Sequence, residues 1–151
     1  MQTKSNNRLI PWFLCIALIV AVALMTVGCA GGSGKTEASA SEAVIQTDGE
    51  VLGTGDTVFP LSVVDADGNE IQAEIHTDKE TVGEALKELD VIAGEESATG
   101  LYVKVVNGIR ADYDEDGTYW AFYINGSYAQ TGVDSTPITE GDSYMLKVEQ
   151  G

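Results

Sequence analysis

A ten-residue stretch of bulky side chains, residues 117–126, most constrains what this chain can fold into. It reads Gly-Thr-Tyr-Trp-Ala-Phe-Tyr-Ile-Asn-Gly, and five of the six residues from 119 to 124 are large and apolar or aromatic. Such a run favours a central strand, because both of its faces must be covered. Asn125 and Gly126 both tolerate positive φ, as a two-residue type I′ turn requires. The stretch therefore predicts the first arm of a hairpin in the middle of a sheet.

The aromatic residues of this hairpin have two interpretations. They either fill a small core, as large rings commonly do, or project from a rim and contact a ligand. For the second interpretation, the candidate ligand-binding residues are Tyr119, Trp120, Phe122, Tyr123 and Tyr128.

Residues 1–28 have the order of a secretory signal, with a polar start that contains Lys4 and is followed by Arg8, and then an uncharged apolar segment. The segment ends in Leu-Met-Thr-Val-Gly-Cys, which resembles the lipobox of bacterial lipoproteins, with Thr26 where leucine is more usual. Cleavage there makes Cys29 a diacylated N-terminus, and two acyl chains hold a protein durably on a membrane. The alternative is an uncleaved spanning helix, because ~20 apolar residues cross a bilayer. Both interpretations place the rest of the chain outside the cytoplasm.

Residues 29–55 are predicted to be a flexible tether. Gly, Ser, Ala, Thr and Glu dominate this segment, and it cannot bury enough apolar surface to offset the entropy of ordering it. The folded domain is then residues 56–151. The two cysteines of the chain, Cys15 and Cys29, both precede it, so the domain has no disulfide and no thiol nucleophile.

The charge balance restricts the possible partners. The chain has 24 acidic and 8 basic residues, a formal charge of −16, and two of the basic residues belong to the signal. Nucleic acid is a poor partner, because phosphate binding needs clustered Lys and Arg. Cations and neutral ligands suit this surface better, and solubility is the alternative explanation of the acidic excess.

The remaining patterns predict an α+β domain. Residues 58–64 and 71–76 alternate as a hairpin with one wet face, on which His76, the only histidine, lies among polar residues. Thr81 and Glu84 fit a capping box before a short helix with an apolar stripe. Residues 101–106 have strand character and end at Asn107-Gly108, a second type I′ turn signal, and residues 144–148 alternate with Tyr144, Leu146 and Val148 on one face. One mixed sheet covered by one short helix accounts for this order.

Several motifs together resemble the transcobalamin-like C-terminal domain family. They are Thr-Val-Gly-Glu-Ala-Leu at 81–86, Tyr-Trp at 119–120, Ile-Asn-Gly at 124–126, Gly-Val at 132–133 and Glu-Gly-Asp at 140–142. This family comprises bacterial lipoprotein and surface modules related to the smaller domain of the cobalamin carriers transcobalamin and intrinsic factor. The resemblance covers about residues 58–148 and implies a β-grasp-like fold.

The same resemblance implies binding of a small soluble ligand, a corrinoid such as cobalamin. The matching positions are the strand at 119–123 and the loop at 125–133. In the carriers a large helical domain holds the other face of the corrin, and this sequence has no counterpart of it. The resemblance therefore implies half of a binding site.

The acidic segment 112–117, Asp-Tyr-Asp-Glu-Asp-Gly, is the other chemical signal. Three alternate aspartates followed by glycine match the first half of an EF-hand calcium loop. The twelfth position is Tyr123 rather than glutamate, which excludes a full EF-hand. Asp112, Asp114 and Asp116 are candidate ligands of a weaker calcium site, and a solvated acidic turn is the alternative.

Two functions are therefore expected from the sequence. The first is a lipid-anchored, extracytoplasmic binding module that delivers a small soluble ligand to a transporter. The second is a calcium-binding structural or adhesive domain of the cell surface. We do not expect an enzyme, because the chain has no histidine cluster, no GxSxG motif and no cysteine nucleophile. An Asp/Glu acid–base pair is the remaining catalytic alternative, but the acidic residues gather in turns rather than on strands that would frame a cleft.

Overall fold

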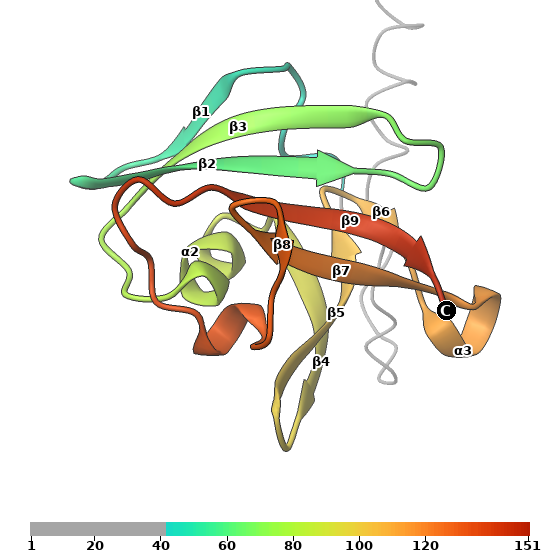
Figure 1. Ribbon diagram of the computed structural model, residues 1–151. Helices are drawn as coiled ribbons and strands as arrows, with labels where there is room; N and C mark the ends of the chain where they lie inside the picture. The colour runs from blue at the N-terminus through green and yellow to red at the C-terminus, as the bar shows by residue number, and fades with distance from the viewer. Residues whose placement is uncertain (1–41) are drawn as a thin grey trace, which may run out of the picture. The chain divides into compact units, whose positions relative to one another are not determined.

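The computed structural model describes residues 42–151 (Figure 1). The predicted signal, the predicted lipidation site Cys29 and the first part of the predicted tether lie outside these residues. Among residues 42–151, no helix has the length and apolar character needed to cross a bilayer.

A six-stranded mixed sheet is the main layer of the fold (Figure 1). Its strand order is β1-β3-β2-β9-β7-β8. The hairpin of β2 and β3 is antiparallel, whereas β1 pairs with β3 and β2 pairs with β9 in parallel. The bounds are β1 Glu50–Gly53, β2 Thr57–Val64, β3 Glu70–Thr77, β7 Thr118–Ile124, β8 Ser127–Tyr128 and β9 Tyr144–Gln150.

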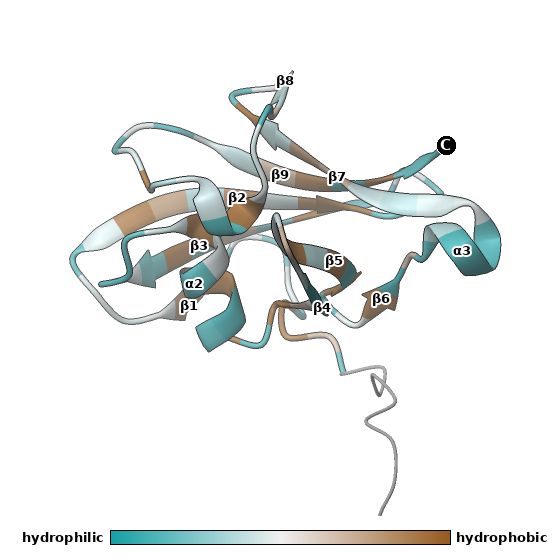
Figure 2. Cartoon of the chain, turned by 90° about the horizontal axis from the view of Figure 1, so that it is seen from below, coloured by the Kyte–Doolittle hydropathy of each residue, from teal (hydrophilic) through white to brown (hydrophobic). Residues whose placement is uncertain are grey.

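The second layer combines one helix with a smaller sheet. Figure 2 shows it on one side of the six-stranded sheet. It consists of α2 (Val82–Glu88) and the strands β4 (Ile92–Ser97), β5 (Gly100–Val106) and β6 (Ile109–Arg110), with α3 (Tyr113–Asp116) and the 3₁₀ helix η1 (Val133–Ser135) in the connections. The predicted α+β class is confirmed, and the separate three-stranded sheet is an addition to the prediction.

The core lies between the two layers. Inward side chains of β2, β3 and β9 are fully buried against the apolar stripe of α2. The ring of Tyr144 contacts Phe59 edge-on at a centroid distance of 5.2 Å and stacks on Phe122 at 6.1 Å. The predicted strand at residues 119–124 is β7, which packs on this core and pairs with β9 along its whole length. Its predicted central position is wrong, because its other neighbour is the two-residue edge strand β8, so β7 lies next to the edge of the sheet.

Two predicted turns and the predicted helix start are confirmed. Asn107 and Gly108 have φ of 48° and 78°, and Asn125 and Gly126 have 50° and 76°, as type I′ turns require. Thr81 caps α2, because its Oγ1 accepts the amide of Glu84 at 3.2 Å.

The fold begins earlier than the sequence predicts. Ile45 is 1% exposed in the core. The side chain of Asn107 binds its backbone in both directions, with Oδ1 accepting from Ile45 N at 2.7 Å and Nδ2 donating to Ile45 O at 3.0 Å. The predicted tether boundary at residue 55 is therefore corrected to about residue 44. The partners that order this segment, β3 and Asn107, are distant in sequence, so local composition does not indicate them.

Candidate ligand-binding face

One face of the six-stranded sheet has no helix over it among the described residues. The second layer lies on the opposite face (Figure 2). Residues directly opposite each other in neighbouring strands point to the same side of a sheet. The register pairs Tyr119 with Glu149, Ala121 with Lys147, and Tyr123 with both Met145 and Tyr128. These side chains together form what we call the outer face.

The structure divides the five predicted ligand-binding residues between two environments. Tyr119, Tyr123 and Tyr128 lie on the outer face. Trp120 and Phe122 are each 7% exposed and belong to the core. The cause is the two-residue period of a strand, which sends neighbouring side chains to opposite sides. Trp120 and Phe122 therefore contribute to packing and are removed from the candidate ligand contacts.

Glu149 connects the phenol groups of the outer face. Tyr123 Oη donates a hydrogen bond to Glu149 Oε1 at 2.5 Å, and Tyr119 Oη lies 3.5 Å from Oε2. Lys147 Nζ is 3.4 Å from the same carboxylate. The rings of Tyr123 and Tyr128 meet edge-to-face with centroids 5.5 Å apart, and Tyr128 is 54% exposed. The arrangement fixes Tyr123 and leaves Tyr128 open to solvent.

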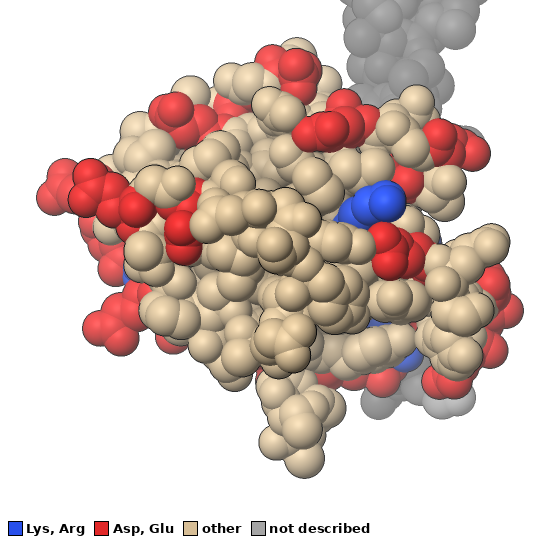
Figure 3. Space-filling view, viewed as in Figure 1, with Lys and Arg blue, Asp and Glu red and all other residues tan. Residues whose placement is uncertain are grey.

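This network sets the charge of the outer face. The hydrogen bond to Glu149 raises the pKa of Tyr123 to about 12. The same bond lowers the pKa of Glu149. At neutral pH the phenol is therefore uncharged, and the charges of Lys147 and Glu149 offset each other. Figure 3 shows a predominantly uncharged surface over the middle of this face, with acidic residues around it.

Sequence reasoning missed Met145, Lys147 and Glu149. The signal is nevertheless present in the sequence, since residues 144–148 alternate and Tyr144, Leu146 and Val148 share the inward face. The intervening residues of that strand must then face outward, beside the tyrosines of β7.

The predicted calcium ligands do not come together as a metal site. Asp112 caps α3, its Oδ2 lies 3.0 Å from Lys104 Nζ and 2.8 Å from Arg110 Nη2, and its side chain is 4% exposed. Asp116 Oδ1 accepts a hydrogen bond from the amide of Thr118 at 2.9 Å. Residues 42–151 contain no group of three or more His, Cys, Asp or Glu side chains that could hold a metal ion. The geometry of this turn therefore does not fit the predicted calcium loop, because its first carboxylate already has two cations as partners.

Comparisons with known proteins found a matching family model and similar solved structures. A family model described as a domain of unknown function (DUF4430) matches residues 79–150. A solved structure of a protein from Ruminococcus gnavus ATCC 29149, described as a candidate metal binding protein, is 28% identical with a TM-score of 0.60. That comparison covers 64% of this chain and 99% of the other.

Haptocorrin in complex with Cbi is a second similar structure, 19% identical with a TM-score of 0.48. The comparison covers 62% of this chain and 25% of haptocorrin, so this chain spans about a quarter of that protein. Among curated proteins, none matches the chain.

Proposed function

We propose that this chain is a binding module that holds a small soluble ligand on the outer face of its six-stranded sheet. One observation carries the proposal: Tyr119, Tyr123 and Tyr128 gather on a face without a covering layer among the described residues. This occurs in a domain whose residues 42–151 include 23 acidic and five basic side chains. An uncharged surface rimmed by polar residues is typical of a binding site, and tyrosine offers both a flat ring and a polar end.

The chemistry of the outer face favours a flat ligand that is neutral or cationic. The phenol of Tyr123 is uncharged at neutral pH, and the one cation of the face, Lys147, is paired with Glu149. The acidic surroundings repel anions. The motif resemblance makes a corrinoid such as cobalamin the first ligand to test. The ring of Tyr128 is the side chain we expect to lie against it.

We also propose a location for the domain, and we assign it no catalytic role. We propose that Cys29 is lipidated and that the domain works outside the cytoplasm, where it passes its ligand to a transporter or surface protein. The fold begins near residue 44, about 15 residues after Cys29 in the sequence. The domain can then reach the ligand without leaving the membrane surface.

Thermal unfolding with and without ligand tests this function. A ligand that binds only the folded state raises the melting temperature. We expect cobalamin to stabilise the wild-type protein and the Tyr113→Ala variant but not Tyr128→Ala. Tyr113 is a matched control, because it is also 54% exposed but lies on α3, outside the outer face. Absence of any shift in the wild type would contradict a corrinoid as the ligand, and equal shifts in the two variants would contradict the face.

Calcium binding in a structural or adhesive role is the second candidate. It is favoured by the R. gnavus protein described as metal binding, which this chain matches over 99% of that protein's length. The acidic turn is its only sequence signal, and the ion pairs of Asp112 oppose it. A calcium-dependent rise in melting temperature that is lost in Asp116→Asn would support this role over the first.

A further inference from the structure

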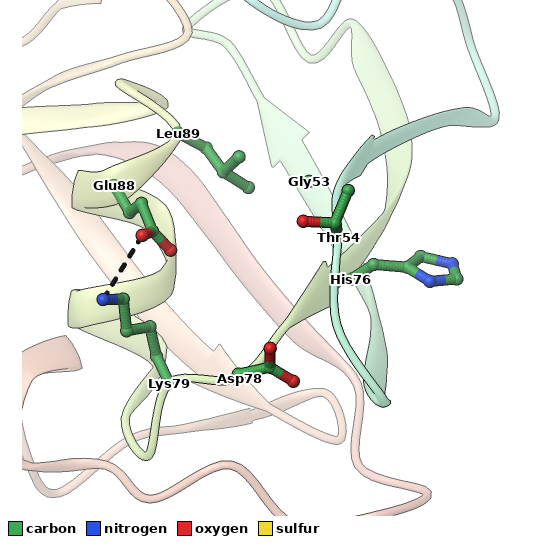
Figure 4. A pocket seen from close by; sticks show the side chains of 7 residues that line it. All are labelled: Gly53, Thr54, His76, Asp78, Lys79, Glu88 and Leu89. Atoms are coloured by element: carbon green, nitrogen blue, oxygen red, sulfur yellow. Dashed lines mark ion pairs between the residues drawn. The ribbon is translucent and has the colours of Figure 1, made fainter.

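A polar pocket of about 430 Å³ lies between the end of β1 and the end of α2 (Figure 4). Sites for small molecules have volumes of roughly 300–1,000 Å³. Its lining includes the end of β1, the segment after β3 and the end of α2, with the residues Gly53, Thr54, Asp78, Lys79, Glu88 and Leu89. His76 also borders it, but its ring points away from the other lining side chains (Figure 4).

The pocket depends on the early part of the fold. Gly53 has φ of +82°, and a Cβ there would meet the carbonyl of His76 and lie 3.2 Å from Leu89 Cδ2. Only glycine therefore lets the chain pass this close to β3 without filling the space toward α2. Gly53 and Thr54 precede residue 79, where the match to the family model begins. This wall of the pocket is thus a feature of the present chain beyond the matched region.

Charges of both signs face the pocket. Lys79 Nζ lies 3.3 Å from Glu88 Oε1, and both side chains are about half-exposed (Figure 4). Asp78 Oδ1 accepts the amide of Asp56 at 3.1 Å. An ammonium has three donors and a carboxylate two oxygens, so all three groups can bind a further partner. An exposed ion pair contributes little to stability, so a ligand can separate Lys79 from Glu88 at small cost.

We propose that this pocket binds a small zwitterion, such as a short peptide with free termini, at a site separate from the outer face. The ligand's ammonium contacts Glu88 and Asp78, and its carboxylate contacts Lys79. When the ion pair of Lys79 and Glu88 is broken, a zwitterion offers a carboxylate to Lys79 and an ammonium to Glu88. A simple amine would pair with Glu88 but leave Lys79 without a carboxylate partner. A simple anion is repelled by the acidic domain around the pocket.

Calorimetric titration of the full-length protein in detergent micelles tests the proposal. The probe is L-alanyl-L-alanine, and the comparison ligands are its N-acetyl derivative, which lacks the ammonium, and its C-terminal amide, which lacks the carboxylate. We expect the free dipeptide to bind about tenfold more tightly than either derivative. Lys79→Met and Glu88→Gln should each weaken its binding about tenfold. Glu84→Gln, on the same helix but outside the pocket, should leave the binding unchanged.

Three results would each overturn the proposal. They are no saturable binding up to about 10 mM dipeptide, equal binding of the capped derivatives, and full binding by both pocket variants. Circular dichroism confirms that the variants fold, which we expect since these side chains are exposed. Tyr128→Ala should bind the dipeptide like the wild type, so failure at this pocket is distinguishable from failure at the outer face.

Discussion

Asp112 is a nearly buried carboxylate whose charge is balanced by two cations. The Lys104 ammonium lies 3.0 Å from it and holds the pKa of this carboxyl below its usual value. Arg110 contacts the same oxygen at 2.8 Å. The sequence pattern of alternate aspartates indicated a metal loop here, whereas the structure uses the first aspartate to cap α3 and to join β5 and β6 to that helix.

The Asp112→Asn variant should be less stable than the wild type, and the difference should depend on pH. The folded pKa of Asp112 lies below the unfolded value of about 3.9. Its contribution is therefore complete above that value and is lost as the pH falls through the folded pKa. We expect the difference in denaturation midpoint to be largest at neutral pH and to shrink below about pH 4. Asp114→Asn in the same turn is the control, and an equal loss there would contradict a special role for Asp112.

Tyr123 and Glu149 give a direct test of the network on the outer face. The carboxylate raises the pKa of Tyr123 to about 12, because a phenolate would lose the hydrogen bond and stand beside a negative charge. In Glu149→Gln we expect the pKa of Tyr123 to fall toward the ordinary value of about 10. Spectrophotometric titration of the tyrosines measures this. An unchanged titration curve would show that the two groups do not interact in solution.

At the level of elements, the contact of α2 with η1 explains a glycine inside a helix. Gly83 is buried, and a Cβ at this position would lie 2.8 Å from the Cα of Asp134. The side chain of Asp134 connects η1 to β5 and to α2. Its carboxylate accepts a hydrogen bond from the amide of Leu101 at 2.9 Å and lies 3.2 Å from Lys87 Nζ. The helix and η1 therefore pack backbone against backbone.

Gly83→Ala should destabilise the protein, although this change usually stabilises a helix. The backbone of η1 must move to admit the methyl group, and overpacking of this kind costs about 1–3 kcal/mol. Gly132→Ala is the matched control, because Gly132 has an ordinary φ of −72° and no atom within 4 Å of the added Cβ. Chemical denaturation compares the two. A Gly83→Ala protein as stable as Gly132→Ala would contradict the close contact.

Elements with a clear period were predictable from the sequence, and those ordered by distant partners were not. The hairpin of β2 and β3, the start of α2 and both Asn-Gly turns follow from local patterns. β1 does not, since only pairing with β3 gives Glu50–Gly53 a strand conformation. The candidate site was half predictable: the aromatic cluster was found, but the strand period had to be combined with the register of β9 to separate Tyr123 from Trp120.

In the molecule as a whole, acidic side chains far outnumber basic ones, so only a minority of the carboxylates can form ion pairs. All five basic side chains of residues 42–151 have an acidic partner within 4.0 Å: Lys79, Lys87, Lys104, Arg110 and Lys147. Residues 42–151 include 23 acidic side chains, so most of these carboxylates repel one another without a basic partner to compensate. This self-repulsion destabilises the compact folded state.

Salt should therefore stabilise the protein. Screening weakens both the few ion pairs and the many repulsions, and the repulsions outnumber the pairs. Raising NaCl from about 10 mM to about 500 mM shortens the screening length from roughly 30 Å to less than 5 Å, and we expect the melting temperature to rise by several degrees. The same measurement in CaCl₂ at matched ionic strength separates screening from binding. A larger rise of the melting temperature in CaCl₂ than in NaCl would indicate a specific ion site. A melting temperature that falls as NaCl is added would mean that the ion pairs outweigh the repulsion.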